Sequence, residues 1–159
     1  MGPSLEPLNL FDVIEKDQIL AADWSDLEFE VALDSGAVVH VCSLDDTPGY
    51  MIEESRGSKR GQEFLMADGG TKPNLGQKTL NLMDGDRELK AIFQIAGVTR
   101  PLMSVGRICD EGHEVTFNSE VAVVKTKEGS EICRFHRLPG GLYVAKMKLR
   151  SPAGFTRQE

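Results

Sequence analysis

Long apolar runs and aromatic residues are scarce in this sequence. No stretch approaches the roughly 18 apolar residues of a membrane-spanning helix, and the first residues lack the basic-then-apolar layout of a secretory signal. Aromatic residues make up only 6% of the chain. We therefore expect no membrane partner and a cytoplasmic or intraparticle setting.

Cysteine and basic charge are also in short supply. Three cysteines, an odd number at wide spacing, do not match a secreted disulfide framework, so we expect free thiols. The 18 basic residues face 25 acidic ones, which gives a formal net charge of −7. This balance lacks the positive footprint of a nucleic-acid-binding protein. We expect no nucleic-acid partner and favour a protein or peptide.

What the chain does contain is an ordinary globular composition, with 40% apolar and 27% charged residues over 159 positions. This length suits one domain with tails. We assign residues 1–24 to an N-terminal tail, 25–150 to the domain and 151–159 to a C-terminal tail. From Asn9 to Leu20 the apolar residues suit a short amphipathic helix within the N-terminal tail.

Alternating apolar residues predict strands with one buried face. Two such runs are the clearest, Leu27 to Leu33 and Leu89 to Ile95. A shorter extended run, 38–42, follows the first, and four more short strands are predicted near the C-terminus, at 115–117, 121–125, 131–135 and 142–149. Many short strands separated by turns indicate a closed, mostly antiparallel all-β architecture.

Turn and helix signals lie between these strands. Asp68-Gly69-Gly70 is a strong hairpin signal, and we expect strands 64–66 and 79–82 to flank this turn. The polar stretch 43–62 reads as a long surface loop. Residues 103–111 suit one short helix that Gly112 closes.

The chemistry centres on Asp34, which ends the strand Leu27 to Leu33 and begins Asp34-Ser35-Gly36-Ala37. Asp-Ser-Gly alone is a common turn. Here, however, an alternating strand, this turn, a glycine-tipped hairpin and an apolar pair before a short helix follow one another in a single order. In this order, Asp34-Ser35-Gly36-Ala37 is more specific as a functional motif than an Asp-Ser-Gly turn alone.

The ordered set resembles the retropepsins, and most closely the protease segment of Copia-type retrotransposon polyproteins. The similarity covers roughly residues 25–147 and includes a serine, Ser104, where viral retropepsins usually have glycine. The matching pieces are Asp34-Ser35-Gly36-Ala37 with His40, Ala67-Asp68-Gly69, the segment 101–108, the segment 111–117, and Gly141-Leu142-Tyr143-Val144.

The resemblance implies a retropepsin-like closed barrel and an aspartic endopeptidase that works as a homodimer on an extended peptide or polyprotein. Each subunit would supply one catalytic aspartate, Asp34, and the two facing carboxylates would share a proton. Ser35 would hydrogen-bond across the dimer axis. Gly36 and Ala37 would leave room for substrate, and Asp68, Gly69 and Gly70 would form the tip of a flap.

No metal or other cofactor is needed for this chemistry. We also expect the dimer interface to include the strand Leu27 to Leu33 and one terminal strand. The pH dependence follows from the shared proton, so activity should be greatest below neutrality.

Two other readings stay open. The first is a catalytically inactive retropepsin fold that serves as a dimerisation or peptide-binding module. The second is a zinc-stabilised β-barrel, because the three histidines and three cysteines fall into the close pairs His40/Cys42, Cys109/His113 and Cys133/His136. Cys133 and His136 are oddly spaced and would point to opposite faces of a strand. Core thiols and surface histidines are therefore favoured over zinc.

Overall fold

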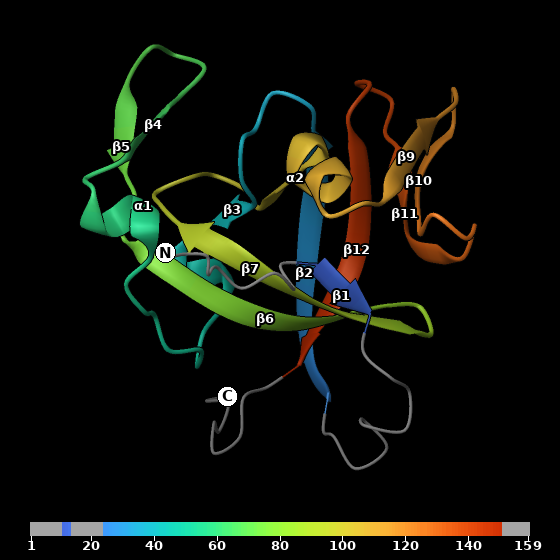
Figure 1. Ribbon diagram of the computed structural model, residues 1–159, viewed down its shortest axis with the longest axis horizontal. Helices are drawn as coiled ribbons and strands as arrows, with labels where there is room; N and C mark the ends of the chain where they lie inside the picture. Colours follow the sequence, from blue (N-terminus) through green and yellow to red (C-terminus); the bar gives the residue numbers. More distant parts are fainter. Residues whose placement is uncertain (1–10, 14–23, 151–159) are drawn as a thin grey trace.

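A computed structural model of the chain describes residues 11–13 and 24–150, and most of these residues lie in strands (Figure 1). The strands form one ten-stranded sheet and a separate two-stranded sheet. The strands are β1 (Phe11–Val13), β2 (Trp24–Asp34), β3 (Val41–Cys42), β4 (Glu63–Leu65), β5 (Thr71–Pro73), β6 (Gly76–Asp84), β7 (Arg87–Ile95), β8 (Leu102–Ser104), β9 (Glu114–Phe117), β10 (Val121–Lys125), β11 (Glu131–Arg137) and β12 (Tyr143–Arg150).

Six of these strands close into a barrel. Around the ring the order is β6, β7, β3, β8, β2 and β12, and β12 pairs with β6 to complete it. Most pairs are antiparallel, but β2 runs parallel to β8 and β3 runs parallel to β7. The predicted closed, mostly antiparallel all-β architecture is confirmed.

A large part of the barrel core comes from the two runs whose alternation was clearest in the sequence. In β2, Phe29, Val31 and Leu33 are buried, while Glu28 before them and Glu30 between the first two are exposed. In β7, every apolar residue from Leu89 to Ile95 is buried. Phe93 sits edge-on against Phe29, with ring centroids 5.3 Å apart. Together with buried apolar residues of β3, β6, β8 and β12, these side chains exclude water from the barrel and contribute to its hydrophobic stabilisation.

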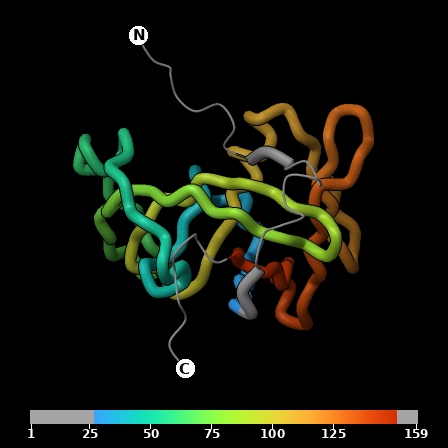
Figure 2. The backbone as a smooth tube through the Cα atoms, turned by 90° about the horizontal axis from the view of Figure 1, so that it is seen from below, coloured from blue at the N-terminus to red at the C-terminus, as the bar shows by residue number. Residues whose placement is uncertain are grey.

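The C-terminal third of the chain extends the sheet beyond the barrel as successive antiparallel strands. Next to β12 lie β11, β10 and β9 in that order. All four predicted strands are present, with β11 two residues longer than expected. Figure 2 shows the long β6–β7 hairpin crossing the molecule toward this extension.

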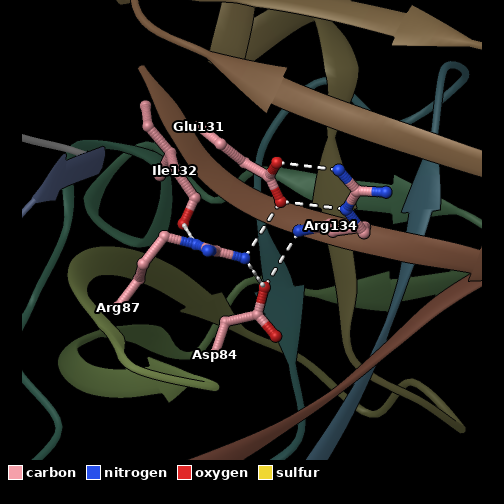
Figure 3. Close-up of polar contacts among 5 residues, drawn as sticks. All are labelled: Asp84, Arg87, Glu131, Ile132 and Arg134. Atoms are coloured by element: carbon pink, nitrogen blue, oxygen red, sulfur yellow. Dashed lines mark hydrogen bonds and ion pairs between the residues drawn. The ribbon is translucent and has the colours of Figure 1, made fainter.

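The turn between β6 and β7 is attached to β11 by charged groups (Figure 3). Arg87 lies 3.0 Å from the Glu131 carboxylate and 3.8 Å from that of Asp84. Arg134 pairs with Glu131 at 2.8 Å, and its backbone N–H donates to Asp84 at 2.9 Å. The Arg134 hydrogen bond is the main cause that lowers the pKa of Glu131, whereas burial raises the pKa of Asp84. The cluster holds the barrel and its extension together.

The described part of the N-terminal segment is a strand, not the helix that the sequence suited. Phe11–Val13 forms β1 and pairs antiparallel with β7, in register Phe11 to Ala91 and Val13 to Leu89. The edge of β7 beyond β3 is open to such pairing, and backbone hydrogen bonds to it outweigh a weak helical pattern. The rest of the expected helix and the tail 151–159 lie outside the described residues.

The stretch 43–62 is more ordered than the surface loop we expected. It contains the 3-10 helix η2 (Leu44–Asp46) and the α-helix α1 (Arg56–Lys59). The buried Lys78 ammonium donates to the Thr47 carbonyl and hydroxyl oxygens, at 2.9 and 3.0 Å. The Tyr50 hydroxyl donates to the Arg150 carbonyl at 2.7 Å. These side chains fix the stretch against the barrel.

The predicted helix of the C-terminal half is α2 (Val105–Asp110), so the described chain has two short α-helices where one was expected. Gly112 follows α2 with a positive φ of 91°, as a closing glycine should. No helix among the described residues combines the length and the apolar character that crossing a membrane requires.

Candidate active site

Asp34 is the last residue of β2 and lies opposite Ser104 of β8 in the parallel register. Its side chain is half-buried, and its Oδ1 accepts a hydrogen bond from the Gly36 N–H at 2.8 Å. A Cβ on Gly36 would stand 3.3 Å from this oxygen, so glycine allows the backbone to approach the carboxylate closely. Ser35 is exposed at the turn. The sequence-predicted aspartate is thus oriented by its own loop.

The loop that carries Asp34 is supported by β8, which lies between β2 and β3 in the barrel. Ser104 is fully buried. Its hydroxyl donates to the Ala37 carbonyl at 2.6 Å and accepts from the Arg107 N–H at 3.0 Å. The same serine therefore caps α2 and holds the loop that carries Asp34. This bridging role is visible only once β8 is placed beside β2.

His40 is the second brace. The expectation of a surface histidine is wrong here, because the ring is 1% exposed and packs on Phe93 with centroids 5.3 Å apart. Its Nδ1 accepts a hydrogen bond from the Ser104 N–H at 3.0 Å. Burial, aided by the nearby Arg107 charge, lowers the pKa of His40 to about 3. His40 is therefore neutral near pH 7 and acts as a buried acceptor.

The predicted glycine-tipped hairpin exists, but its second strand was misplaced. β4 pairs with β5, in register Phe64 to Lys72, whereas residues 79–82 belong to the barrel strand β6. Asp68, Gly69 and Gly70 form the tip, where Gly69 has a φ of 90° and Asp68 Oδ1 accepts from the Gly70 N–H at 2.8 Å. A second turn at 74–76 redirects the chain before β6 begins, which the sequence pattern did not show.

A group of side-chain amides anchors this hairpin at its base. Asn74 is buried and donates to Gln62 at 3.0 Å and to Gln94 at 2.9 Å, while its Oδ1 accepts from the Gly76 N–H. Gln94 belongs to the barrel strand β7. The hairpin β4–β5 otherwise forms its own two-stranded sheet and projects from the barrel in Figure 1. We call it the flap.

A groove of about 880 Å³ connects the flap to Asp34. One wall is the flap, from Gln62 to Asp68 together with Lys72. The floor and the other wall come from the Asp34 loop, the connection between β7 and β8, and Leu142. Asp34 and Asp68, which the sequence placed in a catalytic loop and a flap tip, line the same cavity. An extended peptide would contact both elements at once.

The Asp34 loop and the groove can hold the Asp34 carboxylate beside an extended peptide. Activation of water by a pair of carboxyl groups would need a second carboxylate in addition to Asp34. β2 pairs with β12 along one edge and with β8 on the other edge only over Ala32–Asp34. A second subunit therefore cannot add a strand beside Ala32–Asp34 on that edge, and the predicted interface at this strand stays a prediction.

The histidines and cysteines do not converge. Among residues 24–150, no group of three or more His, Cys, Asp or Glu side chains is arranged to hold a metal ion. Cys133 is buried and His136 is exposed, so they point apart as predicted. Cys42 is also buried, and burial raises the pKa of its thiol. Cys109 is exposed, so it is not a core thiol.

Comparison with protein-family models, with curated proteins and with solved structures found no match to this chain.

Proposed function

We propose that this protein is an aspartic endopeptidase of the retropepsin type, which cleaves extended peptide segments in the groove beside Asp34. The observation that carries the proposal is the shared groove, because a carboxylate at the end of a buried strand faces the tip of a glycine-rich hairpin. The local geometry of Asp34, with its N–H donor from Gly36 and its braced loop, supports the role.

In this mechanism two subunits bring two copies of Asp34 together. Like charges within hydrogen-bond distance do not both ionise, so one carboxyl keeps a proton and polarises the scissile carbonyl. The other carboxylate takes a proton from water, and the resulting hydroxide attacks the carbonyl carbon to give a tetrahedral intermediate. The carboxyl group then passes that proton to the peptide nitrogen, so the C–N bond breaks and the amine leaves. The flap would cover the peptide and exclude bulk water.

The test is digestion of a peptide library by the purified full chain between pH 4 and pH 8, with and without a pepstatin-type inhibitor. We expect inhibitor-sensitive cleavage that is fastest below neutrality. Asp34→Asn should lower the rate by at least about 1000-fold, since the amide cannot take a proton from water. Asp86→Asn, in the exposed turn between β6 and β7 and away from the groove, is the matched control and should retain most of the activity.

The dimeric site has its own test. Mixing equal amounts of wild-type and Asp34→Asn chains should leave about a quarter of randomly formed dimers with two aspartates. Activity should therefore fall with the square of the wild-type fraction. A linear dependence would indicate that one chain carries a complete site. Peptide binding without any cleavage would instead favour the inactive binding module.

A further inference from the structure

The groove contains cations that neither the proposed catalysis nor the fold uses. Five charged residues line it: Asp34, Glu63, Asp68, Lys72 and Arg100. Asp34 is the proposed catalytic group, and Asp68 is turned back onto the Gly70 amide of its own turn. The strand register of the flap decides where the remaining charges point.

Directly paired residues of an antiparallel hairpin lie on the same face of it. Phe64 pairs with Lys72, so these two side chains share one face of the flap, while Glu63 and Leu65 lie on the other. Exposure agrees with this assignment, because Phe64 is half-buried and Leu65 is 76% exposed. The inner face of the flap therefore presents an apolar ring and an ammonium group to the groove. Glu63 belongs to the other face of the strand pair, although it also borders the groove.

Lys72 reaches toward the connection between β7 and β8. Its Cδ lies 3.7 Å from the position that a Cβ would take on Gly97, and Arg100 follows three residues later in the same connection. Across residues 24–150, neither Lys72 nor Arg100 takes part in an ion pair. Two cations without an ion-pair partner thus lie where the flap meets this connection, in a groove that Asp34, Glu63 and Asp68 also line. The whole chain is acidic, with a net charge of −7.

We propose that the groove selects peptides that carry an acidic side chain and that Lys72, on the inner face of the flap, is the main specificity-determining residue. As a preference in cleavage, this inference rests on the proposed function. The carboxylate of a bound peptide would pair with the Lys72 ammonium while apolar side chains beside it contact Phe64 and Leu102. An opposite charge in a partly enclosed groove favours the matching ligand and disfavours a basic one.

Arg100 contributes less than Lys72. It also borders a second groove of about 490 Å³, which Glu28, Glu30, Asp45 and Asp46 line as well. Those carboxylates compete for the guanidinium. Lys72 lines the groove beside Asp34 and is not among the residues of this second groove, so the decisive variant is at Lys72.

The experiment separates binding from cleavage. Fluorescently labelled peptides with Glu, Gln or Lys at each scanned position are titrated onto the full-length Asp34→Asn variant, and polarisation reports the affinity. We expect the best Glu peptide to bind about 3- to 10-fold more tightly than its Gln counterpart, with the difference shrinking as salt is added. Lys72→Glu should reverse the preference toward Lys peptides. Lys72→Met should abolish it.

Lys127→Glu, in the turn between β10 and β11, is the matched control because it makes the same charge change away from the groove. It should keep the wild-type preference. Equal affinity for Glu and Gln peptides, equal behaviour of the two charge reversals, or no binding of any peptide would overturn the inference. Acid-selective binding without cleavage by the wild-type chain would instead reject only the protease. Cleavage without acid preference would reject only the role of Lys72.

Discussion

The loop that carries Asp34 and the flap that faces it are held in different ways. The loop is fixed by buried groups, because His40 and Ser104 connect it to the centre of the barrel. The flap is a separate two-stranded sheet whose connection to the barrel includes the amide group around Asn74. The proposed hydrolase function would need both behaviours, since the reacting carboxylate would have to keep its position while the flap admits and releases a peptide.

The strongest way to test this contrast is to make the same substitution in both regions. Phe93→Ala removes a fully buried ring that contacts Phe29 and His40, and we expect it to lower the free energy of unfolding by about 3–5 kcal/mol. Phe64→Ala removes a half-buried ring of the flap and should cost about 1 kcal/mol or less. Urea denaturation of both variants measures the difference. Equal losses would show that the flap is part of the core.

Acid should weaken the loop support specifically. The pKa of His40 is lowered to about 3 in the folded chain, below the ordinary value of 6.5, so the unfolded state binds more protons between these values. The contribution of neutral His40 is complete above about pH 6.5 and is lost as the pH falls toward 3. At pH 4.5 the loss is about 3 kcal/mol.

His40→Asn should flatten this dependence, because the variant has no group to protonate at that site. His136→Asn, which changes an exposed histidine, is the control and should follow the wild type. Denaturation series at pH 4.5 and pH 7 supply the comparison. An identical acid loss in His40→Asn would contradict the assignment. The two Asp34 carboxyl groups of the proposed dimer need a shared proton, which acid supplies, whereas protonation of His40 in acid weakens the support of the loop. Activity should therefore peak only mildly below neutrality.

A smaller effect on stability, with a larger one on catalysis, is expected for Ser104→Ala. The substitution leaves the Ala37 carbonyl and the Arg107 N–H without their hydroxyl partner and should cost about 1–3 kcal/mol. In peptide cleavage we expect kcat to fall more than KM rises, since the serine positions the loop and does not touch substrate. Ser119→Ala, at an exposed turn, serves as control. A pure KM effect would argue against loop positioning.

The smallest global effect should come from Asn74→Ala at the base of the flap. We expect the free energy of unfolding to fall by about 1 kcal/mol, because the lost hydrogen bonds support mainly the flap. Amide hydrogen exchange should increase selectively in residues 63–73. Asn81→Ala on β6 should leave flap exchange unchanged. Faster exchange throughout the barrel would mean that the two regions are not independent.

The sequence predicted the barrel strands β2 and β7 well because their burial is one-sided or nearly complete, whereas Met103 and Ser104 of β8 were predicted to belong to the helix 103–111. Alternation in β2 and β7 reports directly which side chains face the core. The prediction of a helix in the N-terminal segment failed for a different reason. The three described residues of β1 are too few to show an alternating pattern. Their strand state depends on the edge of β7, which lies far along the chain. The second strand of the flap hairpin was misplaced because the sequence around the second turn, at Asn74 and Gly76, contains no strong turn dipeptide.

The candidate site was predictable where one residue type would carry the proposed chemistry. Asp34 and the tip residues Asp68 to Gly70 were identified from the sequence, and they line or adjoin one groove. The support was missed because it depends on contacts between distant segments. His40 did carry a signal, since it stands within the apolar run from Val38 to Cys42, where a buried ring is expected. Ser104 carried none beyond its position before a short helix.

The insertion of β8 between β2 and β3 also imposes an order on assembly. His40 and Ala37 are 64 and 67 positions from Ser104 in the chain, so both braces are long-range contacts. Such contacts form late, because a long loop must close before they contribute. During synthesis, a nascent chain that ends near residue 100 already contains Asp34 and the entire flap. It still lacks the strand that fixes the aspartate, so the emerging polypeptide cannot present a finished site until segment 102–104 has left the ribosome and joined the barrel.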